Sequence, residues 1–226
     1  MRRRLDVPAL IEQHLAAGEP SGWFEPVYAA AGRRVELLPW HVDGPHPYVV
    51  DWLDDPVVEP PGPRTMVVGC GLGDDAAHLA GRGMRVSAVD VAPSAVRRAR
   101  RRHRRSGVDW HLGDLLTPPE DWRGAFDLVV EVHTVPWLPG VVRDAAMQSI
   151  GSLTAPGGVV LAVTVLATGS EVTDTVVGPP WPQAPAELAA YRAAGLERVA
   201  LEHPDPDESG LLEARLTWHR PPAPGG

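Results

Sequence analysis

Residues 65–80 read TMVVGCGLGDDAAHLA. A short apolar run breaks into three glycines, Gly69, Gly71 and Gly73, and then becomes a stretch that favours helix. Glycine adopts backbone conformations that other residues avoid, and it lets a ligand lie directly against the main chain. We therefore interpret this stretch as a strand, a ligand-binding turn and a helix.

The pattern continues toward the C-terminus as short apolar runs that alternate with helical stretches. Such alternation is typical of an α/β fold with a parallel sheet and crossover helices. The predicted strands are 65–68, 85–89, 108–112, 126–132, 158–166, 197–202 and 211–219. The predicted helices in this part of the chain are 74–82, 93–105, 141–153 and 185–194. The N-terminal residues also predict a short amphipathic helix.

Composition narrows the chemistry. All 21 cationic residues are arginine, and the chain contains neither lysine nor asparagine. P-loop phosphate transfer and Schiff-base catalysis are therefore excluded in their usual forms. No run approaches the length of a membrane helix. A single cysteine excludes an internal disulfide framework, which favours a cytoplasmic protein.

The run RRARRRHRR at 97–105 holds seven of the arginines. It lies on a predicted crossover helix, no aromatic residue interrupts it, and the chain has a net charge of −8. We interpret it as a solvated face or an intramolecular partner for acidic groups, so nucleic acid is not the expected ligand.

The glycine spacing argues against a pyrophosphate ligand. In the dinucleotide fingerprint G-x-G-x-x-G the third glycine would stand at position 74, which here is Asp74. A carboxylate at that place would repel phosphates. Together with Asp75 it suits a ligand that carries positive charge or hydrogen-bond donors, although helix capping is an alternative role for Asp74.

Two more carboxylates end the following predicted strands. Asp90 ends the second strand, where it can accept hydrogen bonds from ribose hydroxyls, and Asp114 ends the third, where it can accept from an adenine amine. The carboxyl ends of parallel strands meet at one edge of the sheet, and ligands of doubly wound folds bind there. We expect these groups to line one nucleoside site.

The series VVGCGLGD, VSAVD, VDWHLGD, FDLVVEVHTV and LTAPGGVVL, over residues 60–166, resembles the motifs of class I S-adenosylmethionine-dependent methyltransferases. The resemblance implies a Rossmann-like, doubly wound sheet of seven strands, mostly parallel with one antiparallel strand near the C-terminus. It also implies an N-terminal helical segment that covers the cofactor (1–63) and a methyltransferase core (64–220). Residues 221–226 form a tail, and the Pro/Gly-rich stretch 169–185 is expected to be a lid-like insertion.

The same resemblance implies roles for the motif residues. The glycines and Cys70 approach the methionine part of the cofactor, and Asp90 with Val91 holds the ribose. Asp114 and Leu115 contact the adenine, and Glu131 helps to hold the amino group.

The N-terminal segment SGWFEPVYAAAG…LPWHVDGPHP resembles that of thiopurine- and halide/thiol-type methyltransferases. Trp40 is the residue expected to cover the cofactor, since an aromatic face attracts a sulfonium cation. Trp23, Trp137 and Trp181 are candidate substrate-binding residues. For each tryptophan the alternative is a packing role.

His133 follows the fourth strand and is the candidate catalytic base, because imidazole accepts a proton near neutral pH. A packing role is its alternative. His41, Asp43 and His46 have residue types that bind metals. They stand in a Pro-broken loop, and this type of methyltransferase needs no metal, so no metal site is expected.

These observations predict transfer of a methyl group from S-adenosylmethionine to an O, S or N atom of a small aromatic or heteroaromatic molecule. The protein is expected to be a monomer or homodimer. The alternatives are a non-catalytic cofactor-binding scaffold, an RNA methyltransferase and an NAD-dependent oxidoreductase.

Overall fold

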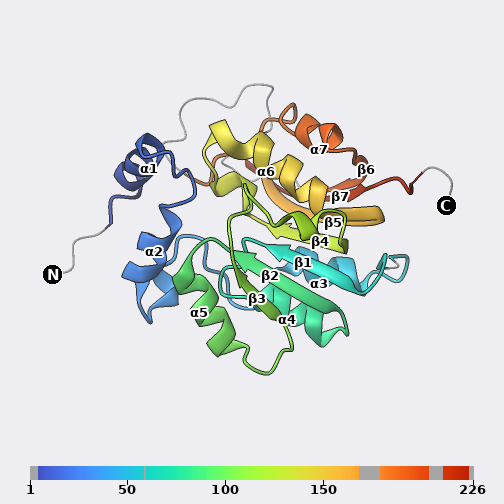
Figure 1. The fold of residues 1–226 in the computed structure, drawn as a ribbon, viewed down its shortest axis with the longest axis horizontal. Helices are drawn as coiled ribbons and strands as arrows, with labels where there is room; N and C mark the ends of the chain where they lie inside the picture. Colours follow the sequence, from blue (N-terminus) through green and yellow to red (C-terminus); the bar gives the residue numbers. More distant parts are fainter. Residues whose placement is uncertain (1–4, 59, 168–178, 204–210, 224–226) are drawn as a thin grey trace.

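The computed structural model describes residues 5–58, 60–167, 179–203 and 211–223. A seven-stranded sheet with the order β3-β2-β1-β4-β5-β7-β6 forms its centre (Figure 1). The strands are β1 (Arg64–Val68), β2 (Arg85–Asp90), β3 (Asp109–Leu112), β4 (Phe126–Val132), β5 (Thr154–Ala167), β6 (Glu197–Glu202) and β7 (Leu211–His219). Strand β7 runs antiparallel to both neighbours, and the other neighbouring pairs are parallel. The predicted doubly wound fold is confirmed.

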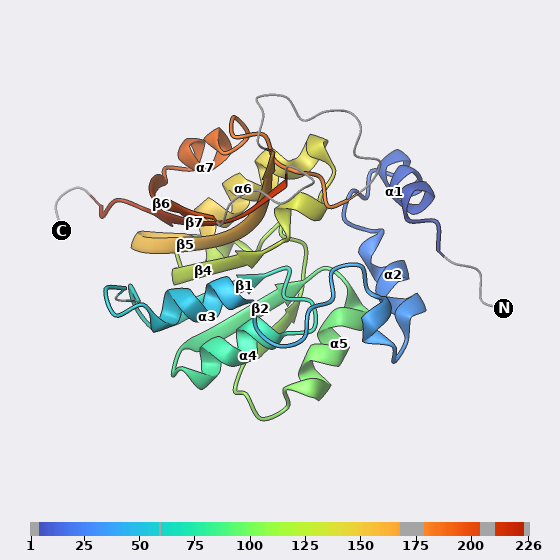
Figure 2. The same ribbon diagram turned by 180° about the vertical axis from the view of Figure 1, so that it is seen from behind.

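Helices cover both faces of the sheet (Figures 1 and 2). On one face lie α3 (Pro47–Asp54), α4 (Asp74–Gly81) and α5 (Pro93–Arg102), and on the other lie α6 (Gly140–Leu153) and α7 (Ala189–Ala193). Side chains of β1 alternate between the two cores: Met66 packs with Met147 of α6, and Val67 packs with Leu79 of α4. Within the described residues, no helix has the length and apolar character to cross a bilayer.

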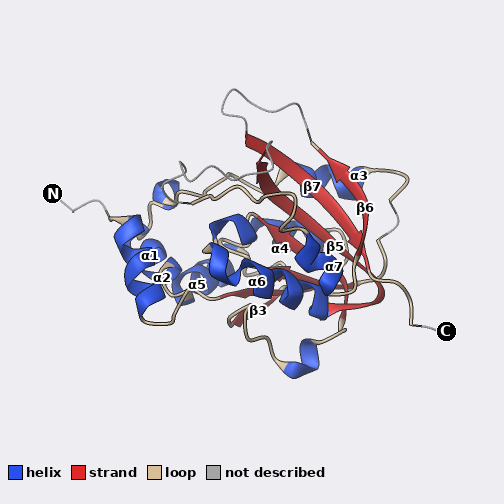
Figure 3. Cartoon of the chain, turned by 90° about the horizontal axis from the view of Figure 1, so that it is seen from above, coloured by secondary structure: helices blue, strands red, loops and turns tan. Residues whose placement is uncertain are grey.

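The N-terminal helices α1 (Val7–Ala16) and α2 (Phe24–Ala31) lie beyond one end of the strands (Figures 1 and 3). Together with the short helix η1 (Val35–Leu37) they form a third apolar cluster. In it, Trp23 and Tyr28 pack with Leu72 of the glycine loop. Because the parallel strands end on this side, the segment covers the carboxyl edge of the sheet.

Two elements begin four residues away from their predicted starts. The fifth strand begins at Thr154 rather than 158, because Thr154 already pairs with Phe126 of β4 before the register shifts. Helix α7 begins at Ala189 rather than 185, because residues 185–188 form turns in which Glu187 accepts a hydrogen bond from Ala184 N (3.0 Å). Most of the expected lid-like insertion, 169–178, lies outside the described residues.

The arginines of α5 make contacts within the protein. Arg98 donates to the carbonyl of Tyr28 (2.6 Å) in α2, and Arg102 donates to Asp74 (3.1 Å) at the start of α4. Arg100 donates to the carbonyl of Trp110 in β3. These bonds agree with the interpretation of the arginine run as an intramolecular partner, and they tie α5 to the N-terminal segment.

Replacement of Gly73 tests how closely the glycine loop packs against Trp110 of β3. It has a left-handed backbone (φ +85°), and a Cβ there would overlap the ring of Trp110. Gly83 has a similar φ of +90°, but a Cβ there would meet nothing within 4 Å. Both alanine variants therefore carry backbone strain of about 1–2 kcal/mol. Only Gly73→Ala also brings its Cβ into a steric clash with Trp110.

We expect Gly73→Ala to lower the free energy of unfolding by about 1–3 kcal/mol more than Gly83→Ala does. Urea denaturation without added ligand measures both values. Equal losses in the two variants would contradict the close packing of Gly73 against Trp110.

Candidate functional site

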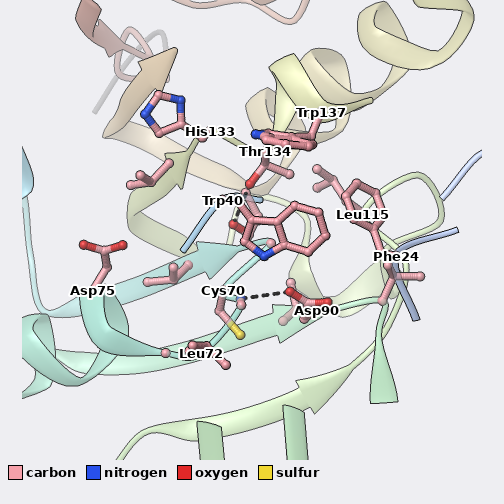
Figure 4. A pocket seen from close by; sticks show the side chains of 18 of the residues that line it. Phe24, Trp40, Cys70, Leu72, Asp75, Asp90, Leu115, His133, Thr134 and Trp137 are labelled. Atoms are coloured by element: carbon pink, nitrogen blue, oxygen red, sulfur yellow. Dashed lines mark hydrogen bonds between the residues drawn. The ribbon is translucent and has the colours of Figure 1, made fainter. Parts of the chain in front are cut away.

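A cavity opens at the carboxyl ends of β1, β2, β3 and β4, beneath the N-terminal segment (Figure 4). This is the edge, at the point where the strand order reverses between β1 and β4, at which doubly wound folds bind ligands. Its lining includes most of the predicted cofactor residues: Trp40, Gly69, Cys70, Gly71, Gly73, Asp90, Val91, Asp114 and Leu115.

The glycine loop forms the floor of the cavity. Cys70 N donates to the carbonyl of Val89 in β2 (3.0 Å), and Gly73 N donates to the carbonyl of Cys70 (2.8 Å), so the turn is held from both sides. A Cβ at Gly71 would come within 3.1 Å of the Tyr28 hydroxyl. The loop therefore presents bare backbone to a narrow space under α2.

Asp90 lies next to this loop and is almost fully buried. One carboxylate oxygen accepts from Gly71 N and the other from Ala92 N, both at 2.8 Å. Burial raises the pKa of Asp90 to about 6, although these two N–H groups favour the charged form. A carboxylate oxygen has two lone pairs, so each oxygen can accept a further hydrogen bond from a ligand hydroxyl.

Asp114 connects the third strand to the N-terminal segment. It accepts from the Ser21 hydroxyl (2.7 Å) and from Leu116 N (2.9 Å). The bond from Ser21 spans 93 positions of the chain and fastens the segment before α2 to the far side of the cavity. This contact makes Ser21 a wall residue that sequence reasoning missed.

Aromatic rings form the upper wall (Figure 4). Trp40 packs edge-on against Trp137 (5.0 Å between centroids) and against Phe24 (5.7 Å). The Trp40 indole N–H donates to the Tyr28 hydroxyl (2.9 Å), and burial followed by the charge of Asp90 raises the pKa of Tyr28. The predicted residues Trp40 and Trp137 therefore stand together on the cavity.

The other two predicted tryptophans do not line the cavity. Trp23 is fully buried behind the wall and stacks on Phe24 (4.1 Å), which takes the lining position in its place. Trp181 is partly buried, and Arg143 lies 5.9 Å from its ring. For both residues the structure favours the packing role over the predicted contact with substrate.

Among the predicted cofactor residues, Glu131 has the position that differs most from the expected one. It is fully buried and is not part of the cavity lining. Its carboxylate accepts from Thr134 N (3.0 Å) and Val135 N (3.4 Å), so it caps the turn after β4. Burial raises the pKa of Glu131 to about 7. Glu131 therefore shapes the site from behind the lining, and its predicted contact with a ligand amino group stays a prediction.

The turn that Glu131 caps brings His133 and Thr134 to the cavity. His133 has a left-handed backbone (φ +53°), which is uncommon for a residue other than glycine. Its Nε2 lies 2.8 Å from Glu213 of β7, and His46, just before α3, lies 3.4 Å from the same carboxylate oxygen. Bonds from the two histidines, that of His133 first, lower the pKa of Glu213.

These three side chains also answer the question of a metal site. Among the described residues, His46, His133 and Glu213 offer three atoms within 4.8 Å of one another that could hold an ion. His41, Asp43 and His46, the metal-type residues noted in the sequence, do not come together as one site. His41 pairs with Asp43 (3.2 Å), whereas His46 turns toward Glu213. Among the described residues, the cluster with metal-binding residue types is therefore His46, His133 and Glu213.

The charge of the cavity lining is one-sided. Among the described residues, the lining holds Asp74, Asp75, Asp90 and Asp114 but no arginine. Asp74 is matched by Arg102 (3.1 Å), whereas Asp75 accepts from the backbone N–H of His46 (2.7 Å). The remaining negative charge suits a cationic ligand or one rich in donors, and it disfavours a phosphate.

Comparisons with known proteins agree with this chemistry. A family model described as a methyltransferase domain matches residues 66–158. The ubiquinone biosynthesis O-methyltransferase of Xanthomonas axonopodis pv. citri (strain 306) is 31% identical over 197 residues, which cover 76% of this chain and 78% of that enzyme. The chain belongs to the class I S-adenosylmethionine-dependent methyltransferases.

Solved methyltransferase structures share the fold. Magnesium protoporphyrin IX methyltransferase from Synechocystis PCC 6803, solved with bound S-adenosylmethionine, aligns with a TM-score of 0.63 at 15% identity over 97% of this chain and all of that one. A protein solved in work on the conversion of a disulfide bond into a thioacetal group during echinomycin biosynthesis aligns with a TM-score of 0.69 at 22% identity. That alignment covers 89% of this chain and 91% of that one.

S-adenosylmethionine is therefore the cofactor of this methyltransferase, and the cavity has the chemistry to take it. The glycine loop leaves space that a Cβ would fill, Trp40 offers an aromatic face, and the aspartates complement a sulfonium and an amine. Ser21, Tyr28, Thr134 and His46 also belong to the lining without a local signal in the sequence, because only the fold brings them to the glycine loop.

The buried carboxyl of Glu131 makes the stability of this methyltransferase depend on pH. Its pKa rises from about 4.5 in the unfolded chain to about 7 in the fold. The unfolded state therefore loses its proton first, and stability falls as the pH rises from about 4.5 through about 7.

We expect Glu131→Gln to reduce this pH-dependent loss of unfolding free energy by on the order of 2–3 kcal/mol. Relative to the native chain, the variant gains stability at pH 8 compared with pH 5. Denaturant unfolding at both pH values measures the difference. An unchanged pH dependence would show that Glu131 is ionised in the fold at no cost.

Proposed function

We propose that this methyltransferase methylates a hydroxyl oxygen, or alternatively a sulfur or nitrogen atom, of a small, uncharged aromatic or heteroaromatic molecule. The observation that carries the proposal is the lining itself, in which aromatic rings meet four aspartates and, among the described residues, no arginine. Trp137, Trp40 and Phe24 offer flat apolar surfaces for a ring.

The residues proposed to bind the cofactor all line the cavity. The backbone of Gly69, Cys70, Gly71 and Gly73 faces the methionine part. Asp90, with Val91 beside it, accepts from the ribose hydroxyls, and Asp114, with Leu115, meets the adenine. The face of Trp40 lies toward the sulfonium. The hydrogen bonds from Gly71 to Asp90 and from Ser21 to Asp114 support these roles, because they hold both carboxylates in the cavity wall.

The chemical step needs little from the protein beyond alignment and the removal of one proton. S-adenosylmethionine supplies a methyl group that its sulfonium already activates. The chain holds the acceptor against Trp137 and excludes water through the N-terminal segment. An acceptor hydroxyl must lose its proton, and His133 at the rim is the group that takes it. A thiol acceptor ionises without such help.

An oxygen acceptor is favoured over the sulfur acceptors of the thiopurine- and halide/thiol-type branch. The relative from Xanthomonas is an O-methyltransferase by name. The histidine at the rim is also held by a carboxylate, which is useful for a hydroxyl and unnecessary for a thiol.

The cofactor site is tested by calorimetry with S-adenosylmethionine, S-adenosylhomocysteine and NAD. We expect the first two to bind and Asp90→Ala to weaken them about 10–100-fold, because hydrogen bonds to a charged group are lost. Asp121→Ala, which removes an exposed carboxylate outside the cavity, is the matched control and leaves binding unchanged. Binding of NAD alone would overturn the proposal.

The acceptor charge is tested with two related catechols. We expect the neutral catechol to be methylated with a kcat/KM about tenfold or more above that of 3,4-dihydroxybenzoate. A carboxylate brought within several ångströms of the aspartates costs about 1–2 kcal/mol. Thiophenol and aniline in the same assay of S-adenosylhomocysteine release report on sulfur and nitrogen. A preference for the carboxylated catechol would contradict the charge argument.

A further inference from the structure

Three side chains from distant parts of the chain meet at the rim of the cavity. His46 stands just before α3, His133 just after β4, and Glu213 on β7. Oε1 of Glu213 lies 2.8 Å from Nε2 of His133 and 3.4 Å from Nε2 of His46, and the two imidazole rings are 5.4 Å apart. Both histidines line the cavity, and Glu213 lies behind them.

The start of α3 determines which nitrogen of His46 carries the proton. His46 caps the helix, and its Nδ1 accepts a hydrogen bond from Tyr48 N (3.2 Å). A nitrogen that accepts has no proton, so the neutral ring is protonated at Nε2. This Nε2 lies 3.4 Å from Oε1 of Glu213. The backbone N–H of His46 is held as well, by Asp75 (2.7 Å).

Glu213 is therefore fixed as an acceptor. The hydrogen bonds from the two histidines lower its pKa, which keeps the carboxylate charged. A charged carboxylate accepts only, so the Nε2–H of His133 donates to it. In neutral His133 the free lone pair then belongs to Nδ1.

We propose that Glu213 and His46 are positioning residues that orient His133 as the proton acceptor of the methyl transfer. This inference rests on the proposed function, in which a hydroxyl is the methylated group. The acceptor O–H bond breaks and its proton moves to Nδ1 of His133. The electron pair of the oxygen forms the bond to the methyl carbon while the carbon–sulfur bond of the donor breaks.

The same helix cap argues against a metal ion in this cluster. An imidazole that binds a metal through Nε2 carries its proton on Nδ1. In His46 that proton would point at the N–H of Tyr48, and the helix cap would be lost. The cluster can bind a metal only by giving up a contact that starts α3.

Other charged groups surround the three side chains and enter any pH profile. Arg215 of β7 lies over the ring of Tyr48 (5.8 Å) and donates to its carbonyl (3.0 Å) and to Glu202 of β6. The charge of Glu213 adds to burial in raising the pKa of Tyr48. The groups to be considered are Tyr48 and Asp51 of α3, Asp75 of α4, Glu202 of β6 and Arg215 of β7.

NMR of the protein labelled with ¹⁵N-histidine tests the geometry without any acceptor. We expect two downfield Nε2–H signals, one from each histidine. His133→Asn removes one, His46→Asn removes the other, and Glu213→Gln weakens both. Glu202→Gln is the matched control, since Glu202 pairs with Arg215 rather than with a histidine, and it leaves both signals in place. A proton on Nδ1 of His46 would overturn the proposal.

Kinetics test the role in proton transfer. With catechol we expect Glu213→Gln to lower kcat about 10–100-fold, to leave the KM for S-adenosylmethionine within twofold, and to move the acid limb of the rate–pH profile to lower pH. Thiophenol, which needs no base, is affected much less, and Glu213→Asp recovers part of the loss. Equal losses with catechol and thiophenol would indicate a purely structural role and would overturn the proposal.

Two further outcomes are distinguished by the same samples. If the native protein methylates none of the test compounds, the proposed function fails, while the NMR signals still decide the hydrogen-bonded arrangement. If Zn²⁺ binds with micromolar affinity, His46→Asn abolishes that binding, and a chelator removes catechol methylation, the cluster is a metal site and the proton-transfer proposal is wrong.

Discussion

The hydrogen bond from Gly71 N–H to the Asp90 carboxylate (2.8 Å) is the interaction on which the site depends. It fixes the glycine turn after β1 against the end of β2, so that bare backbone and an acidic group face the same space. The turn can lie there only because its three glycines have no side chain in the way. A Cβ at Gly69 would press on Thr134, one at Gly71 on Tyr28 and one at Gly73 on Trp110. Close packing around the loop therefore defines the floor of the cavity.

The N-terminal segment forms the wall of the cavity that the sheet leaves open. A doubly wound sheet offers only an open edge at its carboxyl ends. Here Ser21 reaches Asp114, Tyr28 reaches Trp40, and Trp40 reaches Trp137, so that the segment becomes one wall of the cavity. Arg98 of α5 holds the carbonyl of Tyr28 from outside. The arginine run therefore helps to keep this wall in place.

Charge then distinguishes among ligands that the shape alone would admit. Four aspartates in a described lining that holds no arginine favour a sulfonium nucleoside over a pyrophosphate, as the glycine spacing also indicates. The same negative charge supports an uncharged acceptor. The acidic residues in and around the cavity have different roles, however. Asp90 faces the cavity, Glu131 is turned away to cap the chain after β4, and Glu213 stands behind two histidines. In the proposed chemistry Asp90 meets the cofactor, and Glu213 acts through His133.

The sequence by itself determined the alternation of strands and helices, the glycine turn and the acidic ends of β2 and β3. These are properties of neighbouring residues, because periodicity, backbone freedom and the last position of a strand are local. Only the tertiary structure decided that Glu131 is buried while His133 reaches the cavity, since the backbone turns at His133 (φ +53°) directly after β4. It also decided that Trp23 packs behind Phe24. The meeting of His46, His133 and Glu213 follows from the antiparallel placement of β7 beside β5, and contacts between residues 80 or more positions apart leave no trace in any local pattern.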